Sequence, residues 1–126
     1  MNENIFRAYD IRGNAEQDLT PDVLVKIGFV LGNKVKESGS GAIYVGHDSR
    51  LSCQRIFTDL CTGINSSGIK VLNLGLVPTP MVYYATNVGS TNHGVMITGS
   101  HNPKDDNGLK IVLGGGPVSG LDVLNY

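Results

Sequence analysis

The chain has 126 residues and a formal net charge of −1, with 40% hydrophobic and 17% charged residues, which is ordinary for a globular domain. This length supports one domain, residues 1–126, around a single core. The charge gives no electrostatic basis for binding nucleic acid or an anionic membrane surface, and no apolar run is long enough to span a bilayer. Since the first residues also lack the plan of a signal peptide, we expect a cytoplasmic protein without nucleic-acid or membrane partners.

The first part of the chain predicts a short strand and a long helix. Residues 5–13 alternate loosely between apolar and polar and end in a glycine, which predicts a strand that runs into a loop. Residues 20–21 (Thr-Pro) predict an N-cap followed by proline at the first helical position, and the glycine-serine segment 38–41 closes this helix. Gly28 and Gly32, one turn apart, are expected to let the helix pack closely on a sheet.

The rest of the chain alternates strands with helices. Short β-prone runs predict four strands, at residues 42–46, 69–74, 94–97 and 109–113. Helical spacing predicts one helix from about Ser52, a candidate cap, to residue 66, and a short one at 81–86. Such alternation is typical of an α/β layer structure, and the last two strands, joined by a loop without a helix, are expected to be antiparallel. We therefore predict a three-layer α/β/α domain with a mixed, mostly parallel sheet.

The end of the chain gives less information. Residues 114–120 are rich in glycine and carry no fold signal. Because an α/β layer normally covers both faces of its sheet, a further covering helix is expected after them, and we expect the chain to be truncated at its C-terminus.

Two cysteines fall on the predicted second helix. Cys53 and Cys61 are eight residues apart, roughly 12 Å along the helix axis, which is too far for a disulfide. No CxxC pair or paired histidine accompanies them, so they do not form a zinc motif. Both are expected to be buried or half-buried free thiols.

The polar loop after the strand at 94–97 carries groups that suit phosphoryl transfer. Ser100 follows the strand end by three residues, and Gly99 beside it is expected to let the backbone turn sharply and approach a ligand. His101 can exchange protons near neutral pH, and Lys110 returns on the following strand. A hydroxyl, an imidazole and an ammonium group can thus converge at one cleft, where the serine would be alternately phosphorylated and freed.

Other interpretations of this loop compete with phosphoryl transfer. A serine hydrolase is disfavoured, because the order Thr98-Gly99-Ser100 is not G-x-S-x-G and no acidic residue is positioned to orient the histidine. Taken singly, Ser100, His101 and Asn102 are also ordinary turn formers before a proline. The whole string of residues, together with three other segments, decides between these interpretations.

Four segments occur in a fixed order along residues 5–113. They read RAYDIRG at 7–13, VGHDSRLS at 45–52, LVPTP at 76–80, and TGSHNP followed by DNGLK within 98–110. Together they closely resemble the α-D-phosphohexomutases, nearest the phosphomannomutase/phosphoglucomutase branch. The resemblance implies phosphohexomutase domain 1, with domains 2–4 of the same polypeptide as missing partners, since the family's metal loop, sugar-reading loop and distal-phosphate loop are nowhere in the sequence.

The resemblance also implies an activity. Ser100 would give its phosphoryl group to a hexose 1- or 6-phosphate, and regain one from the resulting glucose or mannose 1,6-bisphosphate. Mg²⁺ would contact the phosphoserine oxygen, its other ligands being absent from this chain. Alone, the chain is expected to bind substrate poorly and to catalyse little or nothing.

Further site residues follow from the same resemblance. His101 and Lys110 match positions near the reacting hydroxyl, as base, acid or phosphate partner. Arg12 and Tyr9 match positions that face the same cleft, and Asn102 is assigned to substrate binding. The planar fork of an arginine suits phosphate oxygens, whereas Tyr9 could equally be a half-buried core aromatic.

Other polar residues are expected to be structural. His47 stands where the family often has an arginine, while Arg50 keeps its place. His93 is expected to be a satisfied structural histidine. Asp105 and Asp106 are adjacent carboxylates on a loop, and solvent-facing side chains explain them better than a metal site.

Two alternatives to a phosphomannomutase/phosphoglucomutase domain stay open. One is a phosphoglucosamine mutase, although that loop usually has alanine where Gly99 stands here. The other is a non-catalytic module that binds sugar phosphates through the same loop without turnover.

Overall fold

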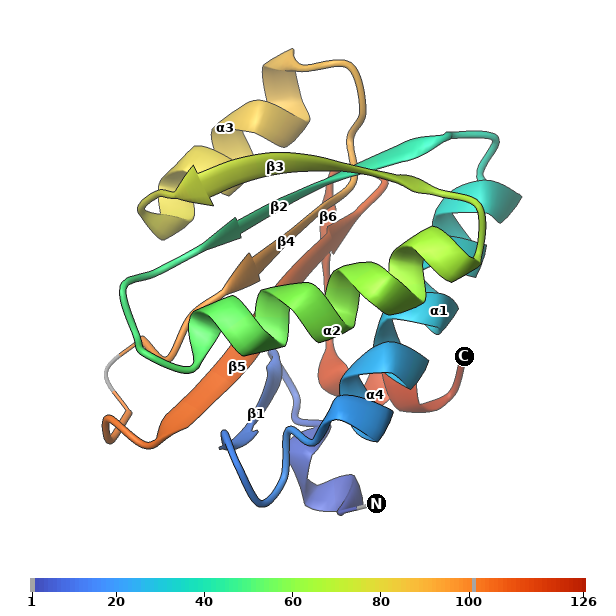
Figure 1. Ribbon diagram of the computed structural model, residues 1–126. Coiled ribbons are helices and arrows are strands. Elements are labelled where there is room, and N and C mark those ends of the chain that lie inside the picture. Colours follow the sequence, from blue (N-terminus) through green and yellow to red (C-terminus); the bar gives the residue numbers. More distant parts are fainter. Residues whose placement is uncertain (1, 101) are drawn as a thin grey trace.

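The computed structural model describes residues 2–100 and 102–126, so the prediction for His101 lies outside the described residues. A six-stranded sheet forms the middle of the domain (Figure 1). The strands are β1 (Ile11–Asn14), β2 (Ala42–His47), β3 (Lys70–Leu76), β4 (Gly94–Ile97), β5 (Asp106–Leu113) and β6 (Gly116–Val118). The helices are α1 (Pro21–Glu37), α2 (Cys53–Ser66), α3 (Thr79–Val88) and α4 (Gly120–Leu124), preceded by a 3₁₀ turn, η1 (Glu3–Ile5).

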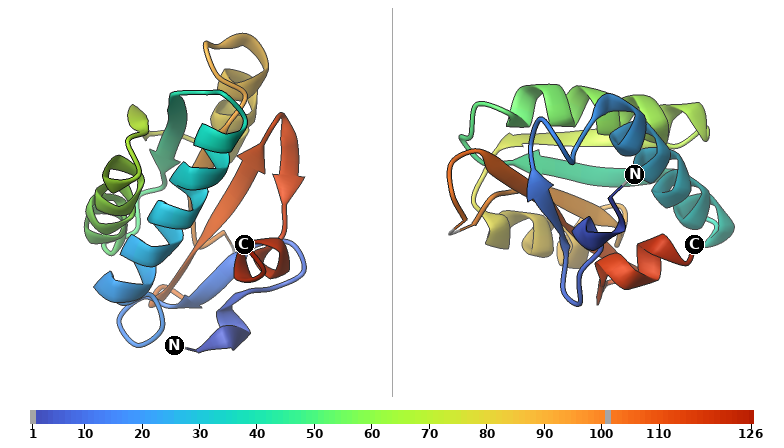
Figure 2. Two further views of the ribbon diagram at one scale, coloured as in Figure 1. Left: turned by 90° about the vertical axis from the view of Figure 1, so that its right-hand side faces the viewer. Right: turned by 90° about the horizontal axis from the view of Figure 1, so that it is seen from below.

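The helices cover both faces of the sheet. Figures 1 and 2 show α1 and α2 side by side over one face and α3 over the other. On the first face Ile43 and Val45 of β2 are fully buried in the main core, to which α1 and α2 contribute. Met96 and Val82 are buried outside that core, on the side of α3. The predicted three-layer α/β/α architecture is therefore confirmed.

The sheet is mixed, as predicted, and its order is β1-β5-β4-β2-β3, with β6 paired to β5. Strand β2 is parallel to both β3 and β4, each of which follows a helix. Strand β5 is antiparallel to β4, β1 and β6. The expectation of a mostly parallel sheet is thus wrong for the described strands, because β5 is reached without a crossover helix and then serves as template for both β1 and β6.

The N-terminal segment differs from the prediction of a strand over 5–13. Its first part is the turn η1, and the chain then reverses at residues 7–10, where the N–H of Arg7 donates to the carbonyl of Asp10 at 2.9 Å. Only Ile11–Asn14 forms a strand. The loose alternation therefore covered one bridging residue, Phe6, which pairs with Ile11, followed by a tight turn and one short strand.

The C-terminal segment, expected to carry no fold signal, forms a strand and a short helix. Gly114 and Gly115 have φ of 64° and 81°, so that β6 folds back onto β5. Such left-handed pairs favour glycine and make a tight hairpin connection. Ser119 and Asp122 then form a reciprocal capping box that starts α4.

The helix starts agree with the sequence in one case and differ in another. Thr20 caps α1 as predicted, accepting a hydrogen bond from the N–H of Val23 at 3.4 Å. Ser52 holds the N-cap position of α2, but its side chain makes no cap hydrogen bond. Its hydroxyl instead accepts a hydrogen bond from the amide of Asn107 at 2.8 Å, which ties α2 to the start of β5.

The small residues of α1 pack against a helix, not against the sheet. A Cβ at Gly28 would overlap the carbonyl of Leu60, and one at Gly32 would overlap the Ser67 hydroxyl at the end of α2. Gly63 of α2 faces the α1 backbone in the same manner. The two helices are close because glycines on both sides remove the side chains that would hold them apart.

Both cysteines are buried and free on α2, as predicted. Burial raises the pKa of each thiol to about 11, and for Cys53 a hydrogen bond to a carboxylate adds to this effect. Among the described residues, no helix is long and apolar enough to cross a membrane.

Candidate active site

The candidate nucleophile Ser100 lies in the loop that follows β4. Its side chain is exposed, and its backbone has φ of 50°. It is the one non-glycine residue with a positive φ in the described part of the chain. A side chain in this left-handed region costs about 1–3 kcal/mol, and such strain persists only where surrounding contacts impose it.

The carboxylate of Asp48, just after β2, holds the first arm of this loop. Its Oδ2 accepts hydrogen bonds from the Thr98 hydroxyl at 2.9 Å and from the Gly99 N–H at 3.0 Å. The Thr98 hydroxyl in turn accepts from the N–H of Ser100 at 3.0 Å. Burial by itself raises the pKa of this carboxyl group, but the hydrogen bonds that the carboxylate accepts outweigh it and hold the pKa of Asp48 below its ordinary value of 3.8.

The guanidinium of Arg50 holds the second arm. Its nitrogens donate to four carbonyl oxygens of the loop, at 2.5–3.1 Å, which belong to Ser100, Asn102, Pro103 and Asp106. The guanidinium also lies 3.8 Å from the Asp48 carboxylate, and its side chain is only 16% exposed. An arginine can satisfy several carbonyls at once because its donors form a fixed fork.

Gly99 is needed for space and not for backbone freedom. Its φ is not positive; the left-handed residue is Ser100. A Cβ at position 99 would overlap the guanidinium of Arg50. The expectation that Gly99 itself makes the sharp turn is therefore corrected: the missing side chain makes room for the arginine.

Arg12 joins the N-terminal segment to the serine loop. Its Nη1 donates to Oδ1 of Asn102 at 3.2 Å, and its Nη2 forms an ion pair with the buried carboxylate of Asp10 at 2.9 Å. Asn102 also donates to the carbonyl of Gly99 at 2.8 Å, closing the turn that contains Ser100. The structure thus brings together three of the predicted site residues, Arg12, Asn102 and Ser100.

Lys110 lies on β5, farther from the loop. It pairs with Met96 across β4, while its neighbours Leu109 and Ile111 are buried in the core on the opposite face. Arg12 pairs with Gly108, two residues before it on the same strand, so Arg12 and Lys110 share one face of the sheet. No hydrogen bond joins Lys110 to the serine loop in the described part of the chain.

Tyr9 lies in the N-terminal turn and is 91% exposed, so the alternative of a half-buried core aromatic is wrong. The first residue of α4 packs on this turn, since a Cβ at Gly120 would overlap the backbone of Arg7 and Asp10. The turn is therefore fixed from behind and presents the phenol ring of Tyr9 to solvent.

The remaining polar residues behave structurally. His93 is 4% exposed; its Nδ1 accepts from the N–H of Gly114 and its Nε2 lies 3.0 Å from the Ser38 hydroxyl, which confirms a satisfied structural histidine. Asp105 is exposed and Asp106 half-buried at the start of β5. Among the described residues, no three His, Cys, Asp or Glu side chains come together in a way that could hold a metal ion.

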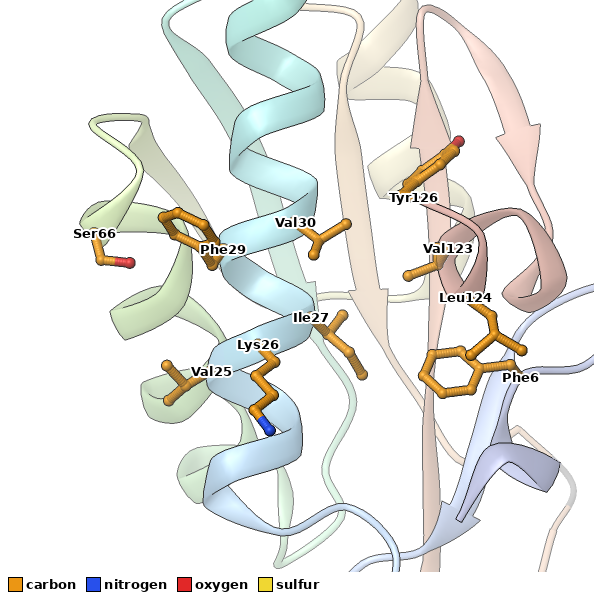
Figure 3. Close-up of a pocket in the computed structure, with 10 residues that line it drawn as sticks. All are labelled: Phe6, Val25, Lys26, Ile27, Phe29, Val30, Ser66, Val123, Leu124 and Tyr126. Carbon is orange, nitrogen blue, oxygen red and sulfur yellow. The ribbon is translucent and has the colours of Figure 1, made fainter. Parts of the chain in front are cut away.

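Cavities also lie outside the predicted site residues, one of them beside His93. A polar cleft of about 720 Å³ is lined by Arg50 together with residues that include Gln17 and Lys104. An apolar groove of about 530 Å³ separates α1 from α4, and Figure 3 shows Phe29, Val30 and Tyr126 around it. Apart from Lys26, this groove offers no charged group to a phosphate, whereas the polar cleft is lined by Arg50, Arg55 and Lys104.

Comparison with known proteins identifies the family of the chain. The chain matches the family described as phosphoglucomutase/phosphomannomutase, alpha/beta/alpha domain I, over residues 3–122. The chain belongs to the phosphoglucomutase/phosphomannomutase family. It is 45% identical over 120 residues to a phosphoglucomutase of Neisseria gonorrhoeae, a match that covers 95% of this chain and 26% of that protein. It is 47% identical over 113 residues to a phosphomannomutase/phosphoglucomutase of Pseudomonas syringae pv. tomato, covering 90% of this chain and 24% of that protein.

A solved structure shows the same domain. The crystal structure of a phosphoglucomutase/phosphomannomutase family protein from Burkholderia thailandensis superposes with a TM-score of 0.91 at 36% identity, covering 98% of this chain and 29% of that one. The chain therefore spans about a quarter of the length of these relatives and corresponds to domain I of the family.

Sequence analysis missed the residues that hold the serine loop of this family domain. Asp48 and Arg50 were seen only as part of a structural loop, and Thr98 only as part of a motif. A signal was present, because Asp48 follows β2 and Thr98 follows β4, and these strands are parallel neighbours. The carboxyl ends of parallel neighbours meet at one edge of the sheet, so residues just after them can touch.

Proposed function

We propose that this chain is the domain of a phosphomannomutase/phosphoglucomutase that carries the transferable phosphoryl group on Ser100. The observation that carries the proposal is an exposed serine in the loop after β4, held in a strained left-handed backbone two residues before Asn102, whose side chain accepts a hydrogen bond from Arg12. Such strain, imposed by the surrounding hydrogen bonds, is typical of functional positions. The hydroxyl would be phosphorylated and freed in alternation, interconverting hexose 1- and 6-phosphates through a bisphosphorylated sugar.

The residues around Ser100 support distinct parts of this activity. Arg12 has donors left over after its bonds to Asp10 and Asn102, and a guanidinium fork suits phosphate oxygens. Lys110 lies on the same sheet face as Arg12 and would supply a second positive charge as the phosphoryl group moves. Tyr9, exposed on its turn, would contact the sugar. His101, beside the nucleophile in sequence, would exchange the hydroxyl proton.

Mg²⁺ does not fit this chain as a cofactor held by the described residues alone. The best-placed carboxylate, that of Asp48, already accepts hydrogen bonds from the loop, and the described residues form no cluster of metal ligands. We therefore propose that any Mg²⁺ ligands besides the phosphoserine lie outside this chain, and we assign no step to the metal. By the same argument the 126 residues alone would turn over little or no substrate.

The experiment uses a chimera, because the chain spans a quarter of its relatives. Residues 3–122 replace the matching segment of the gonococcal phosphoglucomutase, to which the chain is 45% identical. The chimera is expected to interconvert glucose 1- and 6-phosphate and to show one phosphoryl group by intact mass. Ser100→Ala is expected to lower kcat by more than about 10³-fold, since it removes the group that forms the covalent intermediate.

The control is Ser90→Ala, which removes an exposed hydroxyl from another loop and is expected to keep the chimera's rate. A Ser100→Ala chimera that retains its rate and its phosphoryl group contradicts the proposal. Binding of glucose 1,6-bisphosphate by the 126-residue chain, as tight as by the chimera, would instead support a non-catalytic module. Rates with mannose 1-phosphate and glucosamine 1-phosphate, measured in parallel, distinguish a phosphomannomutase/phosphoglucomutase from a phosphoglucosamine mutase.

A further inference from the structure

We propose that Asp48 and Arg50 act together as positioning residues that set the conformation of Ser100 for phosphoryl transfer. We call this pair the loop clamp. The inference rests on the proposed function of Ser100. Within the described residues, every hydrogen bond from the pair to the loop ends on backbone atoms or on the Thr98 hydroxyl, and none ends on the Ser100 side chain, so the pair acts through the loop's shape.

The Asp48 arm reaches Ser100 through one intermediate. The Thr98 hydroxyl has a single hydrogen, which it donates to the Asp48 carboxylate at 2.9 Å. Its lone pairs are then left to accept the Ser100 N–H at 3.0 Å. This relay fixes the direction of the peptide group that precedes the Ser100 Cα, and the orientation of that group about the Ser100 N–Cα bond is what φ measures.

The Arg50 arm fixes the peptide group on the other side of the same Cα. Its Nη2 donates to the carbonyl oxygens of Ser100 at 3.1 Å and Asn102 at 2.8 Å. With the N–H on one arm and the C=O on the other, both peptide groups that flank Ser100 are held. A left-handed serine is the outcome of these two constraints.

The loop clamp is anchored away from the loop that it holds. The second carboxylate oxygen of Asp48 accepts from the N–H of Arg50 at 3.0 Å and from the thiol of Cys53 at 3.0 Å. Cys53 is 1% exposed and lies at the first turn of α2. The rigid junction of β2 and α2 therefore serves as the reference against which the serine is positioned.

In this chain the absence of a side chain at Gly99 leaves the space that the Arg50 guanidinium occupies. A side chain at position 99 would displace the Arg50 guanidinium from the carbonyls that it binds. Without its clamp, Ser100 would relax toward an ordinary backbone conformation and carry its hydroxyl away from the position that the loop now gives it. A misplacement of about 1 Å at a reacting group can cost about 10²-fold in rate, so the clamp is expected to act on kcat.

The first test removes the relay hydroxyl in the chimera described above. Thr98→Val is expected to lower kcat about 10- to 100-fold with KM within about twofold, whereas Thr98→Ser, which keeps the hydroxyl, stays within about threefold of the parent. Thr91→Val is the matched control, because Thr91 is equally buried and its hydroxyl donates to a carbonyl, that of Ala42, away from the loop. Equal losses for Thr98→Val and Thr98→Ser, or no loss for Thr98→Val, overturn the inference.

The second test is a double-mutant cycle between Gly99 and Arg50. Gly99→Ala is expected to lower kcat by at least about tenfold when Arg50 is present, and by less than about twofold in the Arg50→Ala background, where nothing is left to displace. If Gly99→Ala lowers kcat by the same factor with Arg50 present and in the Arg50→Ala background, the inference of a loop clamp is overturned. If Ser100→Ala keeps its rate, the proposed function fails; if Ser100→Ala is inactive while both tests give no effect, the clamp alone fails.

Discussion

The guanidinium of Arg12 donates a hydrogen bond to the Asn102 side chain at 3.2 Å, joining segments ninety residues apart in the sequence. Its other terminal nitrogen holds the buried Asp10 carboxylate, yet the Arg12 side chain remains 32% exposed. The arginine therefore has a fixed position and unused donors at once. That combination suits a group that must present itself to a phosphate beside Ser100.

Arg12→Ala is expected to lower kcat/KM of the chimera for glucose 1-phosphate by about 10- to 150-fold, since hydrogen bonds to charged groups are worth about 1.5–3 kcal/mol. Arg12→Lys keeps the charge and loses the fork, so it should recover only part of this loss. The control is Arg7→Ala, which removes the same charge from an exposed position of the same segment. Steady-state kinetics at two salt concentrations measures kcat/KM for the three variants. Equal losses of kcat/KM for Arg7→Ala and Arg12→Ala would refute a specific role of Arg12 in phosphate binding.

Tyr9→Ala is expected to leave stability unchanged and to weaken sugar-phosphate binding. Because the side chain is 91% exposed, its removal should change the free energy of unfolding by no more than about 0.5 kcal/mol. In the chimera the KM for glucose 1-phosphate should rise about 3- to 30-fold, with Tyr9→Phe close to the parent if ring contact is what matters. The control is Tyr84→Ala, which removes an exposed tyrosine side chain from α3, away from the N-terminal turn. An unchanged KM would remove Tyr9 from the site.

Much of the fold could be predicted because its signals are local. The Thr-Pro start of α1, the apolar strands β2 and β4, and the helix-free link from β4 to β5 each follow from neighbouring residues. The hairpin of β5 and β6 carried a local signal in Gly114 and Gly115 that was not recognised. The pairing of β1 with β5 could not be predicted, because these two strands lie far apart in the sequence. Tertiary pairing, and not local propensity, decides such cases.

In the candidate site, too, residues with local signals were predicted and residues that act through long-range contacts were not. Ser100 and Asn102 were found because they stand together in one motif. Asp48 and Arg50 contact that motif from about fifty residues away, mostly through hydrogen bonds to backbone atoms, and only the parallel pairing of β2 with β4 indicates that they can reach it. Gly99 was predicted to turn the backbone sharply, and this reason was wrong. Only the folded structure shows that the Arg50 guanidinium fills the space beside it.

Gly63→Ala is expected to destabilise the chain even though alanine is the better helix former. In an open helix the change would gain up to about 1 kcal/mol. Here the new Cβ would overlap the backbone of Val25 and Phe29 on α1, and overpacking of this kind costs about 1–3 kcal/mol. Gly41→Ala is the matched control, because its Cβ would meet nothing and its φ is not positive. Urea unfolding measures both, and a Gly63→Ala chain as stable as Gly41→Ala would contradict the close α1–α2 contact.

His93 is expected to make the stability of the domain fall in mild acid. Its Nδ1 accepts from the Gly114 N–H, so Nε2 carries the ring proton and donates to the Ser38 hydroxyl; a second ring proton would break the bond to Gly114. Burial lowers the pKa of His93 from its ordinary value of 6.5.

Because the folded chain disfavours the charged ring, this stabilisation is complete above pH 6.5 and is lost as the pH falls below that value through the lowered pKa. Urea unfolding is measured between pH 7.5 and pH 5, which lie about one unit or more on either side of the ordinary pKa of 6.5. The free energy of unfolding of the parent chain should decline over this range. The decline should be shallower for His93→Gln, because glutamine does not titrate. The variant should also be less stable than the parent at pH 7.5, where the neutral ring makes both hydrogen bonds. Identical pH slopes for the two chains would show that the buried imidazole does not couple protonation to the fold.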